Sequence, residues 1–119
     1  MAQHNDLGKK GEELAINYLQ DNGYAIIEKN YRFKKAEVDV IAQKEGVLVA
    51  IEVKTRSSTY FGNPQDFVNP KKIKLLVIAI DNYVVEKDLD VEVQFDIIAV
   101  LKYKETYKIH HIEDAFLYF

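Results

Sequence analysis

The chain has 119 residues, of which 48% are hydrophobic and 29% charged, with a net charge of −3 and no cysteine. This length suits one domain over residues 1–119, and the lack of cysteine excludes a disulfide framework and a thiolate metal site. No apolar run is long enough to cross a bilayer, and the N-terminus lacks the apolar core of a signal peptide, so we expect a cytoplasmic protein with no membrane partner.

The charges are unevenly distributed along the chain. Residues 29–74 hold 10 basic and 5 acidic side chains, whereas residues 1–28 hold 2 and 5, and residues 75–119 hold 4 and 9. A basic segment around an acidic cluster is what a metal-dependent enzyme that acts on a polyanion needs. A solvated surface with uneven charge would give the same pattern, so composition leaves both interpretations open.

Residues 7–22 are predicted to form a helix, capped at its start by Asn5 or Asp6 and ended at Asn22 and Gly23. Its apolar stripe follows helical spacing and consists of Leu7, Gly11, Leu14, Ala15, Tyr18 and Leu19. At about 100° per residue, Glu13 points to solvent and Glu12 lies at the edge of the stripe. Glu12 is therefore either a half-buried member of a site or an ordinary boundary residue.

A first strand is predicted over residues 24–28, followed by a connection over 30–35 in which cations alternate with aromatic residues. Its Arg32, Lys34 and Lys35 suit contact with phosphates, and its aromatic residues suit stacking on bases. Packing of the aromatic residues beneath the loop would explain them equally well.

Two runs rich in β-branched residues, 37–42 and 47–54, are separated by a short polar stretch, which predicts an antiparallel hairpin. With an even-length connection, over 43–46 or 44–45, Ala42 faces Val47 and Glu37 faces Glu52. Alternation along the strands then gives one apolar face, made by Val38, Val40, Ala42, Val47, Val49, Ile51 and Val53.

The opposite face carries charged side chains at the open end of the hairpin: Glu37, Asp39, Glu52 and Lys54. Like charges opposite each other destabilise a sheet, so Glu37 facing Glu52, with Asp39 on the diagonal, requires a cation. Lys54 is one candidate, and a metal ion shared by two carboxylates is another. An odd-length turn would put Asp39 and Glu52 on opposite faces and remove this reasoning.

Residues 55–69 are predicted to form a loop that leaves the charged end of the hairpin and carries Arg56. Asn69 and Pro70 then mark the start of a second helix, which runs to about Val85 and is apolar nearly all round, as in a helix packed on a sheet or at a subunit interface. Its first turn carries Lys71, Lys72 and Lys74, where the helix dipole disfavours cations. An anionic ligand or plain solvation would offset that cost.

Residues 93–101 and 107–112 are predicted as two further strands, joined by a turn near Lys104 and Glu105. His110 and His111 are adjacent in the second strand, so they point in opposite directions and cannot bind one metal ion. We expect both to be structural or exposed. Residues 113–119 are predicted to form a short helical or irregular tail.

Asp39 followed by Glu52, Val53 and Lys54 resembles the Asp…Glu-x-Lys signature of the restriction-endonuclease-like nuclease superfamily. Further blocks extend the match over nearly the whole chain: Gly8, Gly11, Glu12 and Ala15; Asn30 and Arg32; residues 37–42; residues 52–56; Gly62, Pro64 and Lys72; Phe95 and Asp96. Together they resemble the YraN-like family of small bacterial proteins, whose nearest characterised relatives are archaeal Holliday-junction resolvases. Two positions depart from the family pattern, Ala36 in place of glycine and Gln94 in place of arginine, and the second removes a cation near the presumed site.

The resemblance implies an α/β fold: a restriction-endonuclease-like α-β-β-β-α-β core, with a mixed sheet flanked by helices. It implies a nuclease in which Asp39, Glu52 and the Val53 carbonyl hold Mg²⁺ or Mn²⁺, and Glu12 completes the ligand shell directly or through water. Lys54 would orient or help deprotonate the attacking water, or stabilise charge on the phosphorane.

The resemblance also implies residues that contact the substrate, with DNA, branched DNA in particular, as the expected nucleic acid. The cations that would grip its backbone are Arg32, Lys34, Lys35, Arg56, Lys71 and Lys72. Glu37 would tune the metal from outside its ligands or form a salt bridge to a nearby cation, and Asp96 would position the hairpin.

Two other functions compete with the nuclease. One is a non-catalytic module that binds nucleic acid or a protein partner. The other is a subunit of a larger nucleic-acid-processing assembly, or a homodimer, joined through the apolar second helix and the aromatic tail.

Overall fold

The computed structural model describes residues 2–57 and 69–115. The elements follow one another as α1 (Ala2–Asp21), β1 (Ala25–Phe33), β2 (Ala36–Lys44), β3 (Val47–Ser57), α2 (Pro70–Glu86), β4 (Glu92–Tyr103) and β5 (Thr106–Ile112). The predicted α-β-β-β-α-β core is confirmed, with β5 added after it. Among the described residues, no helix is both long and apolar enough to cross a membrane.

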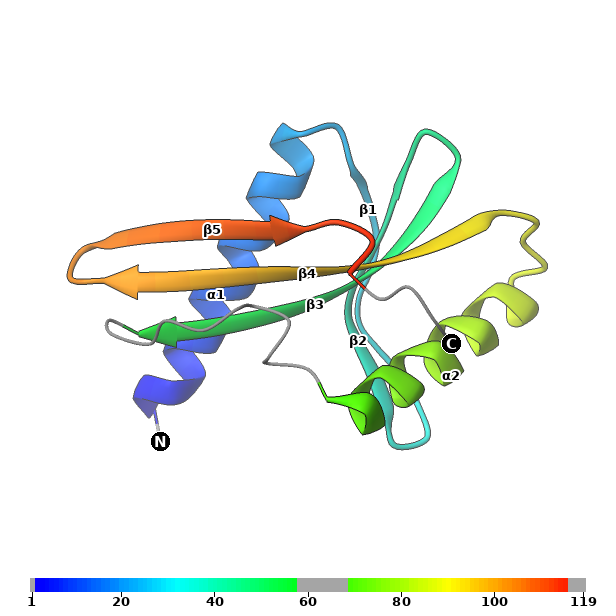
Figure 1. Ribbon diagram of the computed structural model, residues 1–119, viewed down its shortest axis with the longest axis horizontal. Helices are drawn as coiled ribbons and strands as arrows, with labels where there is room; N and C mark the ends of the chain where they lie inside the picture. The colour runs from blue at the N-terminus through cyan, green and yellow to red at the C-terminus, as the bar shows by residue number, and fades with distance from the viewer. Residues whose placement is uncertain (1, 58–68, 116–119) are drawn as a thin grey trace.

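The strands form one mixed sheet in the order β1-β2-β3-β4-β5 (Figure 1). Only β3 and β4 run parallel, and the other neighbouring pairs are antiparallel. A parallel pair needs a long crossover connection, and α2 lies in the one that joins β3 to β4. The central strand β3 therefore has an antiparallel neighbour on one side and a parallel neighbour on the other.

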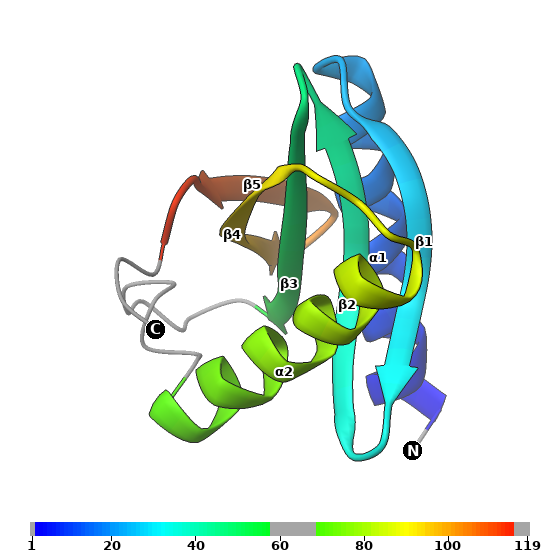
Figure 2. The same cartoon turned by 90° about the vertical axis from the view of Figure 1, so that its right-hand side faces the viewer.

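The two helices cover opposite faces of the sheet (Figure 2). Ala15 and Leu19 of α1 belong to one hydrophobic cluster, together with Val49, Ile51 and Ile98 from the central strands. On the other face, α2 packs into a second cluster through Leu76, Ala79, Ile80 and Tyr83. The mixed sheet flanked by helices, as the sequence predicts, is confirmed.

The end of α1 is confirmed and its start is corrected. Gly23 has a φ of 89°, and the N–H groups of Gly23 and Tyr24 donate to the carbonyls of Gln20 and Leu19, which is the glycine-dependent termination expected there. The helix begins at Ala2, so Asn5 and Asp6 lie within it and neither caps it. Glu13 is exposed and Glu12 is half-buried, as the helical spacing predicts.

The first strand is longer than predicted. β1 continues through Phe33, so most of the expected basic connection is strand that pairs with β2 (Arg32 with Glu37, Phe33 with Ala36). The turn consists of Lys34 and Lys35 alone, with Lys34 at a φ of 56°. Local composition suggested a loop because polar and aromatic residues alternate there, but an edge strand tolerates exposed cations.

The central hairpin forms with a register two residues away from the predicted one. Lys44 pairs with Val47 around a two-residue turn, where Glu45 and Gly46 both have positive φ values (51° and 79°), as a type I′ turn requires. The predicted pairing of Ala42 with Val47 is therefore wrong, and so is the direct opposition of Glu37 and Glu52. The shift is an even number of residues, so Asp39 and Glu52 still share a face.

The later elements agree with the sequence prediction. Asn69 caps α2 by accepting the Lys72 N–H at 2.8 Å, and Pro70 follows it. β4 and β5 form the predicted final hairpin around Lys104 and Glu105. The start of the predicted loop is wrong, because residues 55–57 belong to β3. The rest of that loop, residues 58–68, and the aromatic tail, residues 116–119, lie outside the described residues.

Candidate functional site

The site lies where β2 and β3 separate. Their pairing runs from Lys44 and Val47 to Val40 and Ile51, after which β2 continues beside β1 and β3 continues beside β4 (Figure 1). The separation leaves the Val53 N–H without a strand partner on the β2 side, and Asp39 Oδ2 accepts it at 2.8 Å. This hydrogen bond fixes one carboxylate at the fork between the strands.

Asp39 and Glu52 are brought together, with Asp39 half-buried and Glu52 buried. Glu52 is 1% exposed, although it is a charged residue in the middle of an apolar strand. Burial and the neighbouring charge of Glu52 together raise the pKa of Asp39 to about 7, against the opposing hydrogen bond from the Val53 N–H. Two carboxylates that repel each other in a buried site indicate a demand for positive charge.

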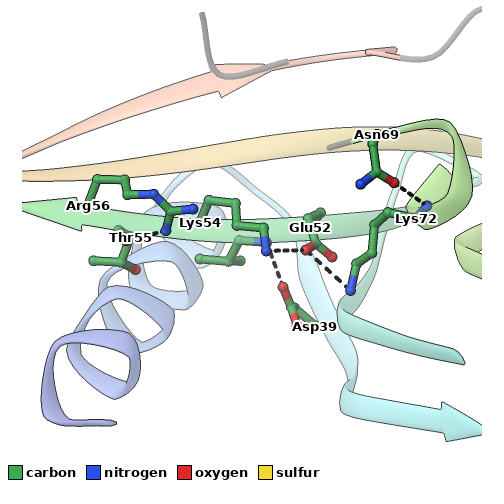
Figure 3. Close-up of polar contacts among 8 residues, drawn as sticks. Asp39, Glu52, Lys54, Thr55, Arg56, Asn69 and Lys72 are labelled. Carbon is green, nitrogen blue, oxygen red and sulfur yellow. Dashed lines mark hydrogen bonds and ion pairs between the residues drawn. The ribbon is translucent and has the colours of Figure 1, made fainter. Parts of the chain in front are cut away.

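Only one oxygen of Glu52 contacts positively charged groups (Figure 3). The ammonium groups of Lys54 and Lys72 lie 3.2 Å and 3.6 Å from Glu52 Oε2. Oε1 is buried and has no hydrogen-bond partner, the only such side-chain atom in the part of the chain that the structure describes. A buried acceptor without a partner costs about 1–3 kcal/mol, so this oxygen is positioned for a ligand.

Glu12 reaches the same place from α1 because of a close helix–strand contact. A Cβ on Gly11 would lie 2.9 Å from Thr55 Cβ and would overlap the Thr55 hydroxyl, so only glycine lets the helix approach β3 this closely. Burial raises the pKa of Glu12, and an Asn30 hydrogen bond of 3.5 Å opposes the rise. Glu12 thus lines the same pocket as Asp39 and Glu52.

These side chains open into one pocket of about 390 Å³. Its lining includes seven residues that the sequence singled out: Glu12, Glu37, Asp39, Glu52, Lys54, Arg56 and Lys72. The remaining four predicted cations, Arg32, Lys34, Lys35 and Lys71, do not line it. Lys34 instead lies 5.4 Å from the centroid of the Phe33 ring at the hairpin tip. The pocket therefore combines the predicted carboxylates with three of the predicted cations.

Glu37 forms the salt bridge that was one of its two predicted roles, and it also lines the pocket. Its carboxylate lies 3.7 Å from the Arg32 guanidinium, its partner in the β1–β2 register. The Arg32 side chain is 73% exposed, so this pair contributes little to stability. Glu37 faces the pocket from a strand on the far side of the fork from Glu52.

The donor set fits a hard divalent cation bound through few protein ligands. Among residues 2–57 and 69–115, no three His, Cys, Asp or Glu side chains lie close enough together to hold a metal ion. Mg²⁺ keeps several waters and is commonly held by one or two carboxylates together with substrate phosphates. Asp39 and Glu52, with the unpartnered Glu52 Oε1, meet that requirement, and Glu12 lies within the same pocket for contact through water.

A second buried polar network was not predicted. Asp96 is fully buried and accepts hydrogen bonds from Gln94, from the Asp114 N–H and from His111, whose other ring nitrogen contacts the Tyr18 hydroxyl at 2.9 Å. The network ties α1, β4 and β5 together, which gives His111 the structural role expected of it. Gln94 serves this network and does not line the 390 Å³ pocket, so the interpretation of its departure from the family pattern as a lost cation near the site is wrong.

The sequence contains one indication of the structural role of His111. His111 lies in a strand with alternating burial, and its neighbour His110 is exposed, as adjacent strand residues should be. The partners Tyr18 and Asp96 come from distant elements, so nothing in the local sequence identifies them.

Comparison with known proteins gives one family. Residues 11–100 match the model described as "Uncharacterised protein family UPF0102". The chain is 60% identical over 119 residues to a UPF0102 protein of Flavobacterium psychrophilum and 62% identical over 119 residues to one of Christiangramia forsetii, with 100% of both chains covered in each case. It is 46% identical over 116 residues to a UPF0102 protein of Phocaeicola vulgatus, which covers 98% of this chain and 96% of that relative.

Proposed function

The chain belongs to the UPF0102 family, the YraN-like family that its residue blocks resemble, and we propose that it is a metal-dependent nuclease. The observation that carries the proposal is the carboxylate pair of buried Glu52 and half-buried Asp39 at the fork between β2 and β3, with Lys54 beside Glu52 and Glu52 Oε1 left without a partner. Buried carboxylates that repel each other destabilise a fold, so their presence together is best explained by a cationic ligand.

In this proposal Asp39 and Glu52 hold Mg²⁺ or Mn²⁺, with Glu12 as a contact through water. When bound there, the metal would supply positive charge that activates a water and polarises the phosphate. Lys54 lines the same pocket, with its ammonium 3.2 Å from Glu52 Oε2, and would stabilise the charge that develops on the phosphate oxygens. Arg56 and Lys72 bind neighbouring phosphates, since both line the same pocket.

The substrate we propose is DNA, branched DNA in particular. This follows from the resemblance of the residue blocks to the YraN-like family, whose nearest characterised relatives are archaeal Holliday-junction resolvases. Four predicted cations lie outside the pocket and would bind the backbone away from the cleaved bond: Arg32, Lys34, Lys35 and Lys71. We place the activity in the cytoplasm, which agrees with a chain that has no cysteine.

Cleavage assays test the proposal directly. Purified protein is incubated with four-way junctions, flaps, linear duplex and structured RNA in Mg²⁺, Mn²⁺ or EDTA. We expect cleavage with either metal, none in EDTA, and a loss of at least about 100-fold in Asp39→Asn and Lys54→Met. Asp81→Asn and Lys74→Met are matched controls, because both residues are exposed on α2 and do not line the pocket.

A binding module that does not cut nucleic acid is the competing function. The Lys54 and Lys72 ammonium groups already lie against Glu52, so the carboxylate has cationic partners without a metal. This function predicts binding that is equal in EDTA and Mg²⁺, that both pocket variants retain, and that is accompanied by no cleavage. That result would exclude the nuclease.

Self-association is a separate part of the proposal. Ile78 and Val85 of α2 are 49% and 78% exposed, so the helix presents apolar side chains on its outer side as well as to the sheet. A homodimer or a larger assembly would cover them. Light scattering across a concentration series tests this, and a monomer throughout would refute it.

A further inference from the structure

Lys72 reaches the site from the start of α2, a position where a cation is unfavourable for the helix. It lies in the first turn of α2, whose dipole disfavours positive charge, and its backbone N–H is held by the Asn69 cap at 2.8 Å. The neighbouring Lys71 is exposed, whereas the Lys72 side chain is 33% exposed and lies 3.6 Å from Glu52 Oε2. The charge of Glu52 compensates for the unfavourable position on the helix.

Lys54 and Lys72 together do not complete the coordination of Glu52. Both ammonium groups lie against the same oxygen, Oε2, and leave Oε1 buried without a partner (Figure 3). A lysine ammonium carries a single charge on a flexible stem, whereas a divalent cation brings two charges to the carboxylate pair. The arrangement is that of counter-ions in a site built for a different cation.

A divalent cation on Asp39 and Glu52 would repel both ammonium groups at this range. Lys54 comes from the same strand as Glu52, two residues away, so it stays near the pocket in either state. Lys72 comes from a separate element, makes the longer of the two contacts, and has part of its side chain in solvent. Lys72 is therefore the group that a cation would displace.

We propose that Lys72 exchanges partners within the site: it is the counter-ion of Glu52 before a divalent cation binds, and a ligand of a substrate phosphate afterwards. The inference rests on the proposed nuclease function. It assigns Lys72 two successive roles, in which it competes with the metal and then binds the polyanion that the metal attracts. A lysine that only grips the backbone would have no effect on the affinity for metal.

Metal affinity separates these roles without any measurement of cleavage. Mn²⁺ binding to the full chain is measured by calorimetry at pH 8 for the wild type, Lys72→Met and the control Lys71→Met. We expect Lys72→Met to bind Mn²⁺ about threefold to tenfold more tightly, because no ammonium has to leave Glu52, and Lys71→Met to match the wild type. Methionine keeps the apolar stem, and the Asn69 cap bonds only to the backbone, so α2 is expected to fold in both variants.

Binding of a labelled four-way junction tests the second role. We expect Lys72→Met to weaken binding about threefold more in Ca²⁺ than in EDTA, because in EDTA the wild-type lysine is still held by Glu52. If the wild type binds no Mn²⁺, the proposed function and this inference both fail. If it binds Mn²⁺ but Lys72→Met leaves the affinity unchanged, or if the loss of junction binding is equal in Ca²⁺ and EDTA, this inference alone is overturned.

Discussion

Replacing Asp39 by asparagine should stabilise the metal-free protein at neutral to alkaline pH. Burial and the charge of Glu52 raise the Asp39 pKa from its ordinary value of 3.8 to about 7. The folded state therefore binds a proton more tightly than the unfolded state does, so stability falls as pH rises from about 4 to about 7. Three pKa units correspond to about 4 kcal/mol of lost stability at pH 8.

Asparagine removes that cost and keeps the shape of the side chain. Its amide oxygen still accepts the Val53 N–H, now at 2.8 Å without a charge, which weakens the hydrogen bond by about 1 kcal/mol. We therefore expect Asp39→Asn to raise the free energy of unfolding by about 2–3 kcal/mol at pH 8. Most of the gain should disappear at pH 4.5, where the folded wild type is already protonated at this position.

Urea denaturation in EDTA at the two pH values measures both quantities, with exposed Asp81→Asn as the matched control. Adding Mg²⁺ at pH 8 should stabilise the wild type and leave Asp39→Asn nearly unchanged, since binding to the folded state alone raises stability. A loss of stability in Asp39→Asn at pH 8 in EDTA would refute the reasoning. It would mean that the lysines around Glu52 already compensate the Asp39 charge.

Three further changes test how the site is held. Gly11→Ala should destabilise the protein by about 1–2 kcal/mol, because the clash with Thr55 exceeds the gain in helix propensity. Adding Thr55→Ala should recover part of that loss in urea denaturation. If the effects of the two substitutions on stability are fully additive, the contact is refuted. Lys54→Met should abolish cleavage but bind Mn²⁺ at least as tightly as the wild type in calorimetry; loss of metal binding would make the lysine a structural residue. Asn69→Ala should cost about 1 kcal/mol through loss of the α2 cap, measured by urea denaturation, and an unchanged midpoint would contradict the role of the cap.

Much of the fold follows from local patterns in the chain. The glycine that ends α1 and the Asn69–Pro70 start of α2 each depend on residues close together in sequence. The length of β1 does not, because an exposed edge strand and a polar loop have similar composition. The two-residue register shift was also beyond the sequence, since Glu45 takes a positive φ that glycine or asparagine usually supplies.

The candidate site was predicted in its residue types and only partly in its geometry. Parity placed Asp39 and Glu52 on one face, and an error of two residues preserves parity. The same error gave Glu37 the wrong neighbour, because its real partner is Arg32 on a strand whose extent was underestimated. The pocket-facing position of Lys72 depends on where α2 crosses the sheet, which no local pattern specifies.

Counting odd and even positions along the strands correctly predicts that Asp39 and Glu52 lie together. It does not predict which core the neighbouring residues of β2 pack into, and the fork between β2 and β3 explains the difference. Residues two apart on a strand normally share a face, yet Val38 packs in the cluster under α2 and Val40 packs in the cluster under α1. Asp39, between them, therefore lies where β2 turns from one core to the other. On the opposite branch, Val53 packs toward α1, while Glu52 contacts Lys72 from α2. A carboxylate pair at this position can be reached from α1, through Glu12, and from α2, through Lys72. The separation of the strands thus allows groups from both faces of the sheet to reach Asp39 and Glu52, whereas a continuous ladder would keep those groups apart.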